Sequence, residues 1–103
     1  MNIVQEIMKM VDHSLLSPTL SDKALEEGCA TAVKYQTASV CVKPYHVRSA
    51  ANHLKGSDVD VGAVVGFPHG NSVTQIKAAE TQQVLADGTV EVDMVVNIGK
   101  VLS

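Results

Sequence analysis

Short apolar segments alternate with segments of helical periodicity along this chain, and this alternation constrains its fold more than any other feature. The apolar segments span residues 38–42, 59–67 and 91–99 and are rich in valine. Hydrophobic residues at helical spacing fill the stretches between them. Strands joined through helices by loops of about 2–6 residues pair in parallel, with right-handed crossovers. The sequence therefore predicts an α/β domain with a parallel sheet.

Residue types that favour helix ends delimit the helical stretches. Four stretches have the helical pattern: 3–11, 22–35, 44–55 and 73–87. Ser21 suits the N-cap of the second stretch, and Pro44 suits the first position of the third. Gly56 and Gly88 suit the ends of the third and fourth. A short first strand is expected near Asp12, where apolar residues flank the carboxylate.

The composition limits the classes of partner. The chain has 103 residues, of which 46% are hydrophobic and 18% charged, and its net charge is −3. This length suits one domain. A negative chain lacks the basic surface that holds nucleic acid or an anionic membrane, and no apolar run approaches the roughly 20 residues that cross a bilayer. We expect a cytoplasmic protein that binds neither, with free thiols at Cys29 and Cys41.

The segment 91–99 carries a carboxylate, Asp93, in the middle of an apolar strand. Side chains alternate between the two faces of a strand, so Asp93 lies opposite the apolar face formed by Val92, Met94 and Val96. We expect that apolar face to pack on the helices. The other face of the sheet is expected to gather four side chains: Asp12, Cys41, Lys43 and Asp93. A buried carboxylate is costly unless it is paired, so such a cluster indicates a site.

Each of these side chains also has a purely structural interpretation. Asp93 could pair with a lysine or a backbone N–H, and Asp12 could tie a turn. Cys41 could be a small buried hydrophobe, the commonest role of a free cysteine. Lys43 could be a solvated loop lysine, although it ends a strand, where the sites of α/β proteins gather. The residues alone leave these alternatives open, and the histidines show no metal-ligand spacing.

Five ordered segments resemble the deoxyribose-phosphate aldolase family: VDHSLLSP, ASVCVKPYHV, VVGFPHGNS, KAAETQQVLADG and VEVDMVVNIGKVLS. The resemblance runs from about residue 11 to the C-terminus. It implies a (β/α)8 or TIM barrel, of which residues 1–103 would form the N-terminal half, a truncated single domain with the first four strands. It also implies a reaction that reversibly joins acetaldehyde and glyceraldehyde 3-phosphate into 2-deoxyribose 5-phosphate. That reaction uses a Schiff base on lysine, without metal or organic cofactor.

The resemblance also implies roles for individual residues. Asp93 in VDMVVNIG matches the family's aspartate that transfers protons, and Asp12 in VDHSLL matches an aspartate near the active-site lysines. Cys41 in SVCVKP matches a cysteine that borders the substrate pocket, and we place Lys43 in that pocket too. The family usually has alanine where Thr89 follows Gly88, a departure that affects a turn and not the site.

The family's Schiff-base lysine and a second lysine that lowers its pKa lie on the sixth and seventh strands, beyond this chain's last strand. Without such an amine there is no nucleophile for imine formation, so we expect this chain alone to be inactive. Lys43 and Lys100, which are expected at strand ends, are weak candidates to replace the Schiff-base lysine. The alternative to an incomplete aldolase is a non-catalytic half-barrel module or a breakdown fragment that self-associates.

A four-stranded half barrel would have two unpaired edges and an open inner face. Either the set Val59, Val61, Ala63 and Val65 or the residues between them would lie on that face. Two copies in a head-to-tail ring would pair first strands with fourth strands and leave no edge open. We therefore expect a homodimer that binds a small phosphorylated sugar or aldehyde.

Overall fold

A four-stranded parallel sheet forms the centre of the protein. The computed structural model describes residues 1–103, and its strands are β1 (Asp12–Leu15), β2 (Ser39–Val42), β3 (Asp60–Val65) and β4 (Glu91–Met94). They lie in the order β1-β2-β3-β4, and every neighbouring pair is parallel. The predicted α/β class with consecutive parallel strands is confirmed.

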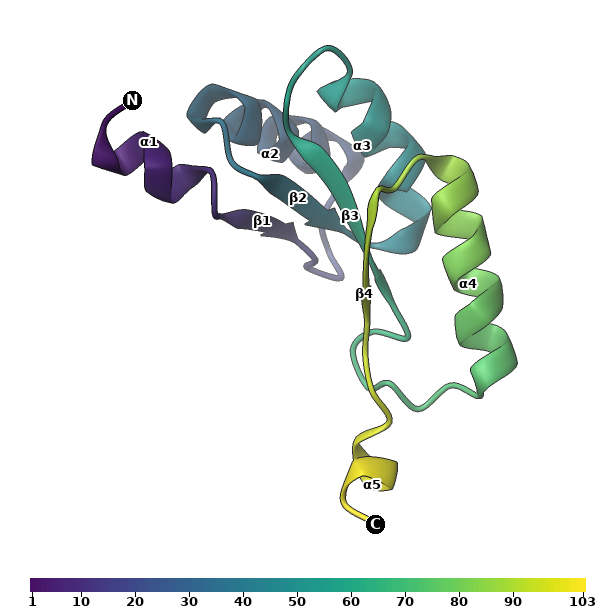
Figure 1. Cartoon of the computed structure of the whole chain (residues 1–103). Helices are drawn as coiled ribbons and strands as arrows, with labels where there is room; N and C mark the ends of the chain where they lie inside the picture. Colours follow the sequence, from purple (N-terminus) through teal and green to yellow (C-terminus); the bar gives the residue numbers. More distant parts are fainter.

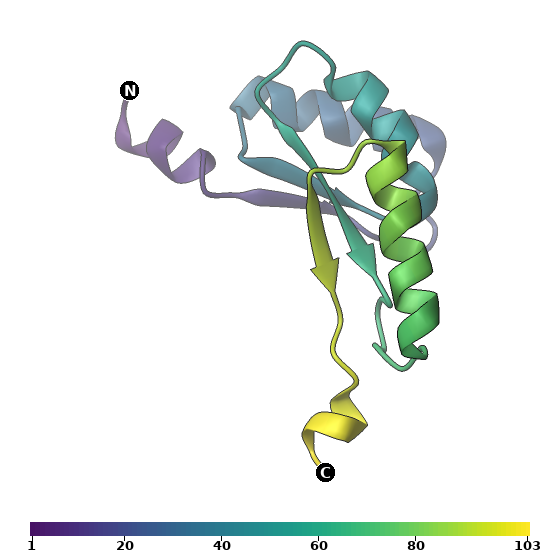
Figure 2. The same ribbon diagram turned by 45° about the vertical axis from the view of Figure 1, so that its right-hand side comes forward.

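Three helices cover one face of this sheet, and none covers the other (Figures 1 and 2). They are α2 (Asp22–Tyr35), α3 (Val47–Leu54), which follows the 3-10 turn η1 (Pro44–His46), and α4 (Thr74–Asp87). Ser21 caps α2 by accepting a hydrogen bond from the Ala24 N–H, and Gly88 ends α4 in the left-handed conformation. None of the helices combines the length and apolar character needed to cross a bilayer.

Alternate residues of the strands form the core with these helices. Val40 and Val42 face the helices as predicted, and in β3 the same is true of Val61, Ala63 and Val65. The core also takes the buried positions of the helices: Leu25, Cys29, Ala32, Val47, Ala50, Leu54 and Val84. The other residues of β3 alternate with these core valines and alanine and therefore belong to the inner face: Asp60, Gly62 and Val64.

The expectations about the last strand are wrong in part. β4 ends at Met94 and not at Gly99, because β3 ends at Val65 and the chain turns away at Gly66 (φ 66°). Val92 packs against the core, but Met94 and Val96 are 49% and 60% exposed beside α4, where no further helix covers them.

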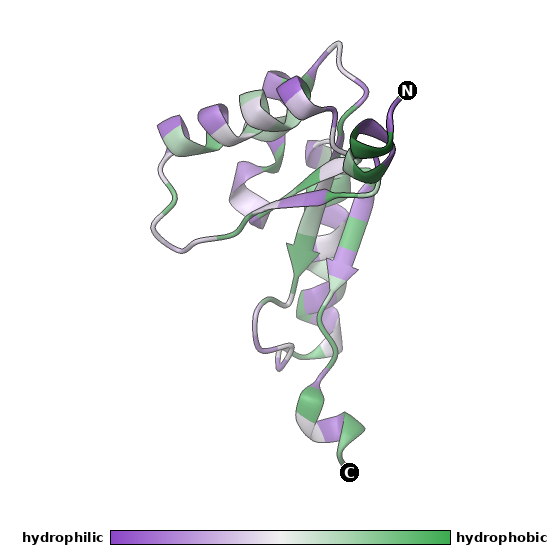
Figure 3. Ribbon diagram, turned by 90° about the vertical axis from the view of Figure 1, so that its left-hand side faces the viewer, coloured by the Kyte–Doolittle hydropathy of each residue, from purple (hydrophilic) through white to green (hydrophobic).

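The two ends of the chain form short helices that project from the body (Figures 1 and 2). At the N-terminus, α1 (Ile3–Met8) is shorter than the 3–11 predicted and buries no residue. At the C-terminus, α5 (Ile98–Val101) is capped by the Asn97 side chain, at a place where the sequence pattern predicts no helix. Hydrophobic residues lie on both, as Figure 3 shows. Each is therefore a helix with unburied apolar surface.

Candidate functional site

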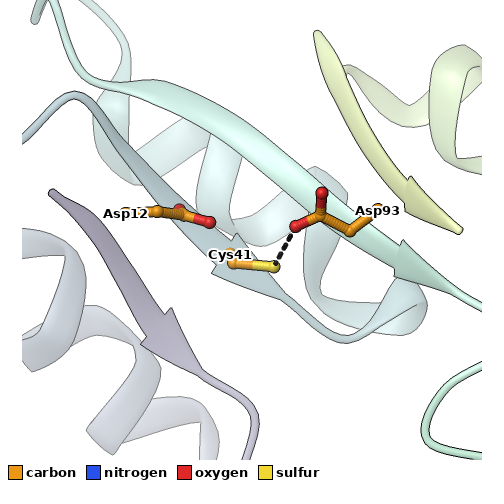
Figure 4. Close-up of side chains that lie close together, drawn as sticks. All are labelled: Asp12, Cys41 and Asp93. Atoms are coloured by element: carbon orange, nitrogen blue, oxygen red, sulfur yellow. Dashed lines mark hydrogen bonds between the residues drawn. The ribbon is translucent and has the colours of Figure 1, made fainter. Parts of the chain in front are cut away.

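Asp12, Cys41 and Asp93 meet on the inner face of the sheet (Figure 4). Cys41 Sγ donates to Asp93 Oδ2 over 3.6 Å. One polar atom from each of the three side chains lies within 4.8 Å of the others. The structure thus brings together three of the four site residues predicted from the sequence.

This convergence requires a curved sheet. Asp12 begins β1 and Asp93 lies in β4, and these are the two edge strands. Edge strands of a flat four-stranded sheet lie roughly 14 Å apart, since neighbouring strands are spaced by about 4.8 Å. Their carboxylates come within 4.8 Å of each other here. The inner face is therefore concave, as it is in a barrel wall.

Register and residue size shape the concave face. Ser39 lies beside Asp12 in the β1–β2 ladder, and its hydroxyl donates to Asp12 Oδ1 over 2.7 Å. Gly62 lies beside both Cys41 and Glu91. A Cβ at Gly62 would lie 3.6 Å from the Glu91 Cβ, so the glycine keeps the space between these side chains free.

Burial and the negative charge of this face keep the Cys41 thiol protonated. Burial is the main factor that raises the pKa of Cys41 to about 12, followed by the charges of Asp12 and Asp93 and the hydrogen bond to Asp93. The pKa of Glu91 is raised too, by its partial burial and by Asp12, Asp60 and Asp93. At neutral pH, Cys41 is therefore a neutral donor and not a nucleophile.

Apolar side chains surround the carboxylates and form a groove. Besides the three site residues, its walls include Leu16, Val64, Phe67, Val92 and Val95. The lining contains no lysine. The groove is thus a polar floor with apolar sides, suited to a small molecule that exchanges protons with a carboxylate.

Lys43 lies away from the cluster. Its ammonium donates to the Ser17 carbonyl over 2.6 Å and lies 5.2 Å from the centre of the Tyr45 ring. It lines a neighbouring hollow that shares Leu16, Val64 and Phe67 with the groove. The assignment of Lys43 to the substrate pocket stays a prediction. The other weak substitute, Lys100, lies in α5 and not at a strand end.

The cluster is compact enough to be considered as a metal site, with two carboxylates and one thiol as its ligand set. The Cys41 thiol donates its proton to Asp93, so a metal ion would have to displace this hydrogen bond. The same hydrogen-bonded pair is suited to proton exchange.

Sequence reasoning missed Glu91 as a member of this face. Glu91 lies two residues before Asp93 in the same strand, and strand alternation could have placed it there. It also missed Lys77 and Glu80 of α4, which bind backbone groups at the ends of β4 and β3. Helical periodicity places them only on a partly buried face, so no local pattern predicts these long-range contacts.

A model of the DeoC/LacD family of aldolases matches residues 6–102, nearly the whole chain. The chain belongs to this family. The deoxyribose-phosphate aldolase of Rhodopirellula baltica is 47% identical over 98 residues, which are 95% of this chain and 41% of that enzyme. The chain spans about two fifths of the length of the curated relatives it matches.

Solved aldolases share the fold of this DeoC/LacD chain. An aldolase named QR15 superposes with a TM-score of 0.88 at 34% identity, over 99% of this chain and 44% of that one. The deoxyribose phosphate aldolase of Aeropyrum pernix, described as a tetramer, gives a TM-score of 0.88 at 24% identity, over 93% and 41%. These neighbours are TIM barrels, so the four-stranded sheet is confirmed as part of such a barrel.

Proposed function

We propose that this chain supplies the first four strands of a deoxyribose-phosphate aldolase that cleaves 2-deoxyribose 5-phosphate into glyceraldehyde 3-phosphate and acetaldehyde, and joins them again. The convergence of Asp12, Cys41 and Asp93 on the concave face is the observation that carries the proposal (Figure 4). An aldol reaction needs a group that takes and returns a proton at carbon. An exposed carboxylate over a groove with apolar sides suits that need.

In the synthetic direction, a lysine amine adds to the carbonyl of acetaldehyde, and water leaves to give an iminium ion. Loss of a proton from the methyl carbon gives an enamine. The enamine carbon forms the new bond to the aldehyde carbon of glyceraldehyde 3-phosphate, whose oxygen takes up a proton, and water then releases the sugar from lysine. We assign both proton transfers to Asp93, directly or through a water molecule.

The other residues of the cluster support this carboxylate. Asp12, fixed by the Ser39 hydroxyl, keeps the local charge negative and suits a neighbouring lysine ammonium. Cys41 donates to Asp93 and, as a neutral thiol, borders the substrate without reacting. We place Lys43 at the outer edge of the pocket, in the neighbouring hollow.

We propose that the Schiff-base lysine comes from a part of the enzyme beyond these residues, and that this chain alone is inactive. The lysines near the strand ends are engaged: the Lys43 ammonium binds the Ser17 carbonyl and the Lys77 ammonium binds the Val95 carbonyl. An amine held as an ammonium donor is not a free nucleophile.

We further propose that the chain forms a head-to-tail dimer in the cytoplasm. β1 and β4 each have one neighbour and one free edge. The inner face carries no helix, and Phe67, which lines its groove, is 45% exposed. Pairing β1 of each copy with β4 of the other would satisfy both free edges.

Borohydride trapping tests the absence of a Schiff-base lysine. The chain is incubated with acetaldehyde and sodium borohydride, and its intact mass is measured. We expect no adduct beyond the slow modification that exposed lysines such as Lys23 also undergo, because no amine lines the groove. An adduct that forms preferentially at Lys43 or Lys100 would contradict this part of the proposal.

A joined protein tests the aldolase assignment. Residues 1–103 are fused to the part of the Rhodopirellula baltica enzyme that lies beyond the match, and cleavage of 2-deoxyribose 5-phosphate is measured. We expect activity, and we expect Asp93→Asn to lower kcat by roughly 10²- to 10⁴-fold, as for loss of a general acid-base group. The control is Asp58→Asn, an exposed carboxylate outside the groove. A folded, inactive fusion, or a fully active D93N variant, would overturn the assignment.

A further inference from the structure

The segment after β4 leaves the sheet at Val95. The Val95 N–H still donates to the Val65 carbonyl over 2.9 Å, but β3 ends there and the chain leaves the sheet at Gly66. Beyond Val95, the backbone makes no further bond to β3. Asp93 lies two residues before this point, so a contact at Val95 acts close to the end of its strand.

Lys77 makes that contact. Its ammonium donates to the Val95 carbonyl over 2.8 Å in a partly buried position. Hydrogen bonds to a charged group are stronger than those between neutral groups. This bond joins the first turn of α4 to the carboxyl end of β4.

Gly66 leaves room for the side chain of Lys77. A Cβ at Gly66 would lie 3.1 Å from Lys77 Cε and 3.5 Å from its Cγ, so the lysine stem passes directly over this glycine. The Gly66 N–H in turn donates to Glu80 Oε1 over 2.9 Å. Lys77 and Glu80, one helical turn apart, thus fix the carboxyl ends of β4 and β3 respectively.

Gly70 contacts the segment after β4 from the loop between β3 and α4. It has φ +67°, and a Cβ there would lie 2.0 Å from the Val96 carbonyl oxygen. Its N–H donates to the Gly66 carbonyl over 2.7 Å. The loop between β3 and α4 therefore packs directly on the backbone that follows Asp93.

We infer that Lys77 is a positioning residue for Asp93: by holding the Val95 carbonyl, it keeps the Asp93 carboxylate over Cys41. The catalytic meaning of this inference rests on the proposed function. The claim that Lys77 fixes the position of Asp93 is independent of that function, because the contact between Cys41 and Asp93 can be measured without any activity.

Thiol alkylation reads out this position, with a control inside the chain. Asp93 covers and accepts from the Cys41 thiol, whereas Cys29 is fully buried in the core under α2 and reports general opening of the fold. Lys77→Met keeps the aliphatic stem and removes the ammonium. Lys77→Arg keeps a charged donor, and Lys23→Met removes an ammonium from the exposed side of α2 as a matched control. Alkylation by iodoacetamide is followed at each cysteine by mass spectrometry.

We expect K77M to accelerate alkylation of Cys41 by roughly tenfold, the change that follows loss of a hydrogen bond to a charged donor, with the rate at Cys29 unchanged. K77R restores slow labelling, and K23M matches the original chain. Unchanged labelling of Cys41 in K77M, or a parallel rise at Cys29, would overturn the positioning role. These outcomes are independent of the fusion assay, so the inference and the proposed function can fail separately.

Discussion

Cys41 and Asp93 form a protected pair on the inner face. Cys41 is 2% exposed, and its thiol donates to the carboxylate of Asp93, which lines the groove. The negative side chains around it raise the cost of removing its proton. In the proposed function an aldehyde passes next to Cys41, and this arrangement then prevents a side reaction, because the thiolate is the reactive form of cysteine.

Asp93→Asn tests the electrostatic part of this protection. Removing the charge lowers the pKa of Cys41, while burial, the larger cause, still raises it. We expect alkylation of Cys41 at pH 8.5 to become a few-fold faster, measured by mass spectrometry. Asp58→Asn serves as the control. Equal rates in D93N and the original chain would show that burial alone protects the thiol.

Glu91 makes the free energy of unfolding depend on pH. Its pKa in the folded chain is raised above the value in the unfolded chain. The folded state then holds this proton more tightly, so the contribution of Glu91 is fully present below the unfolded pKa and is lost as pH rises through the folded pKa. The ionised side chain therefore weakens folding at neutral pH.

Glu91→Gln should remove this penalty. We expect the variant to exceed the original chain in free energy of unfolding at pH 7, by less than about 1 kcal/mol because the side chain is largely exposed and screened. The gain should shrink to nothing below about pH 4, the ordinary range of a glutamate pKa. Urea unfolding at both pH values measures it. A gain that does not change with pH would assign the effect to packing instead.

At the scale of elements, the loop between β3 and α4 is fixed by a close approach of two backbones. Gly70 is buried against the Val96 carbonyl, with no room for a side chain. Gly56 provides a comparison, because it has a similar left-handed conformation (φ +84°) and a Cβ there would meet nothing within 4 Å. The two glycines therefore have similar backbone conformations, and only Gly70 has neighbouring atoms where a side chain would lie.

Gly70→Ala is therefore expected to cost more than Gly56→Ala. Both substitutions place a side chain in the left-handed region, at roughly 1 kcal/mol, and only the first also forces the loop and the segment after β4 apart. We expect a total loss of about 2–4 kcal/mol for G70A, measured by urea unfolding. Equal losses for the two variants would show that the loop can move without cost.

Helix boundaries follow from local signals, whereas the end of the last strand does not. The stretch 22–35 matches α2, because Ser21 caps it and the buried positions repeat at helical spacing. The residues of 91–99 favour a strand throughout, so the sequence predicts one strand over the whole stretch. Its pairing ends where β3 ends, and that depends on Gly66, some thirty positions earlier in the chain. Local patterns carry no information about such a limit.

In the candidate site, too, some features follow from local sequence patterns and others depend on long-range contacts. Strand alternation predicts that Asp93 and Cys41 share a face, because that face is set within each strand. The close approach of Asp12 and Asp93 from opposite edges depends on the curvature of the whole sheet. The Lys43 ammonium lies away from the cluster because it binds the Ser17 carbonyl in another loop. Contacts between residues far apart in the sequence decide the positions of Asp12 and of Lys43.

At the scale of the whole molecule, the charge of the inner face governs how two copies can meet. The face carries four carboxylates: Asp12, Asp60, Glu91 and Asp93. A head-to-tail dimer that closes the sheets into one barrel would place both sets inside the same enclosure. Like charges in a poorly solvated space repel strongly, and burial favours their protonated forms.

The proposed dimer should therefore bind protons as it forms, and its association should strengthen as pH falls. We expect light scattering to show more dimer at pH 5 than at pH 8, and high salt at pH 8 to act in the same direction by screening. The double variant D12N/E91Q should dimerise at pH 8 as the original chain does at lower pH. Association that is independent of pH, and that is lost in Ile7→Lys, would instead place the contact on the exposed apolar residues of α1, which are Ile3, Val4 and Ile7. In that geometry the carboxylates of the inner face would remain in water, and their protonation would not affect the association of two copies.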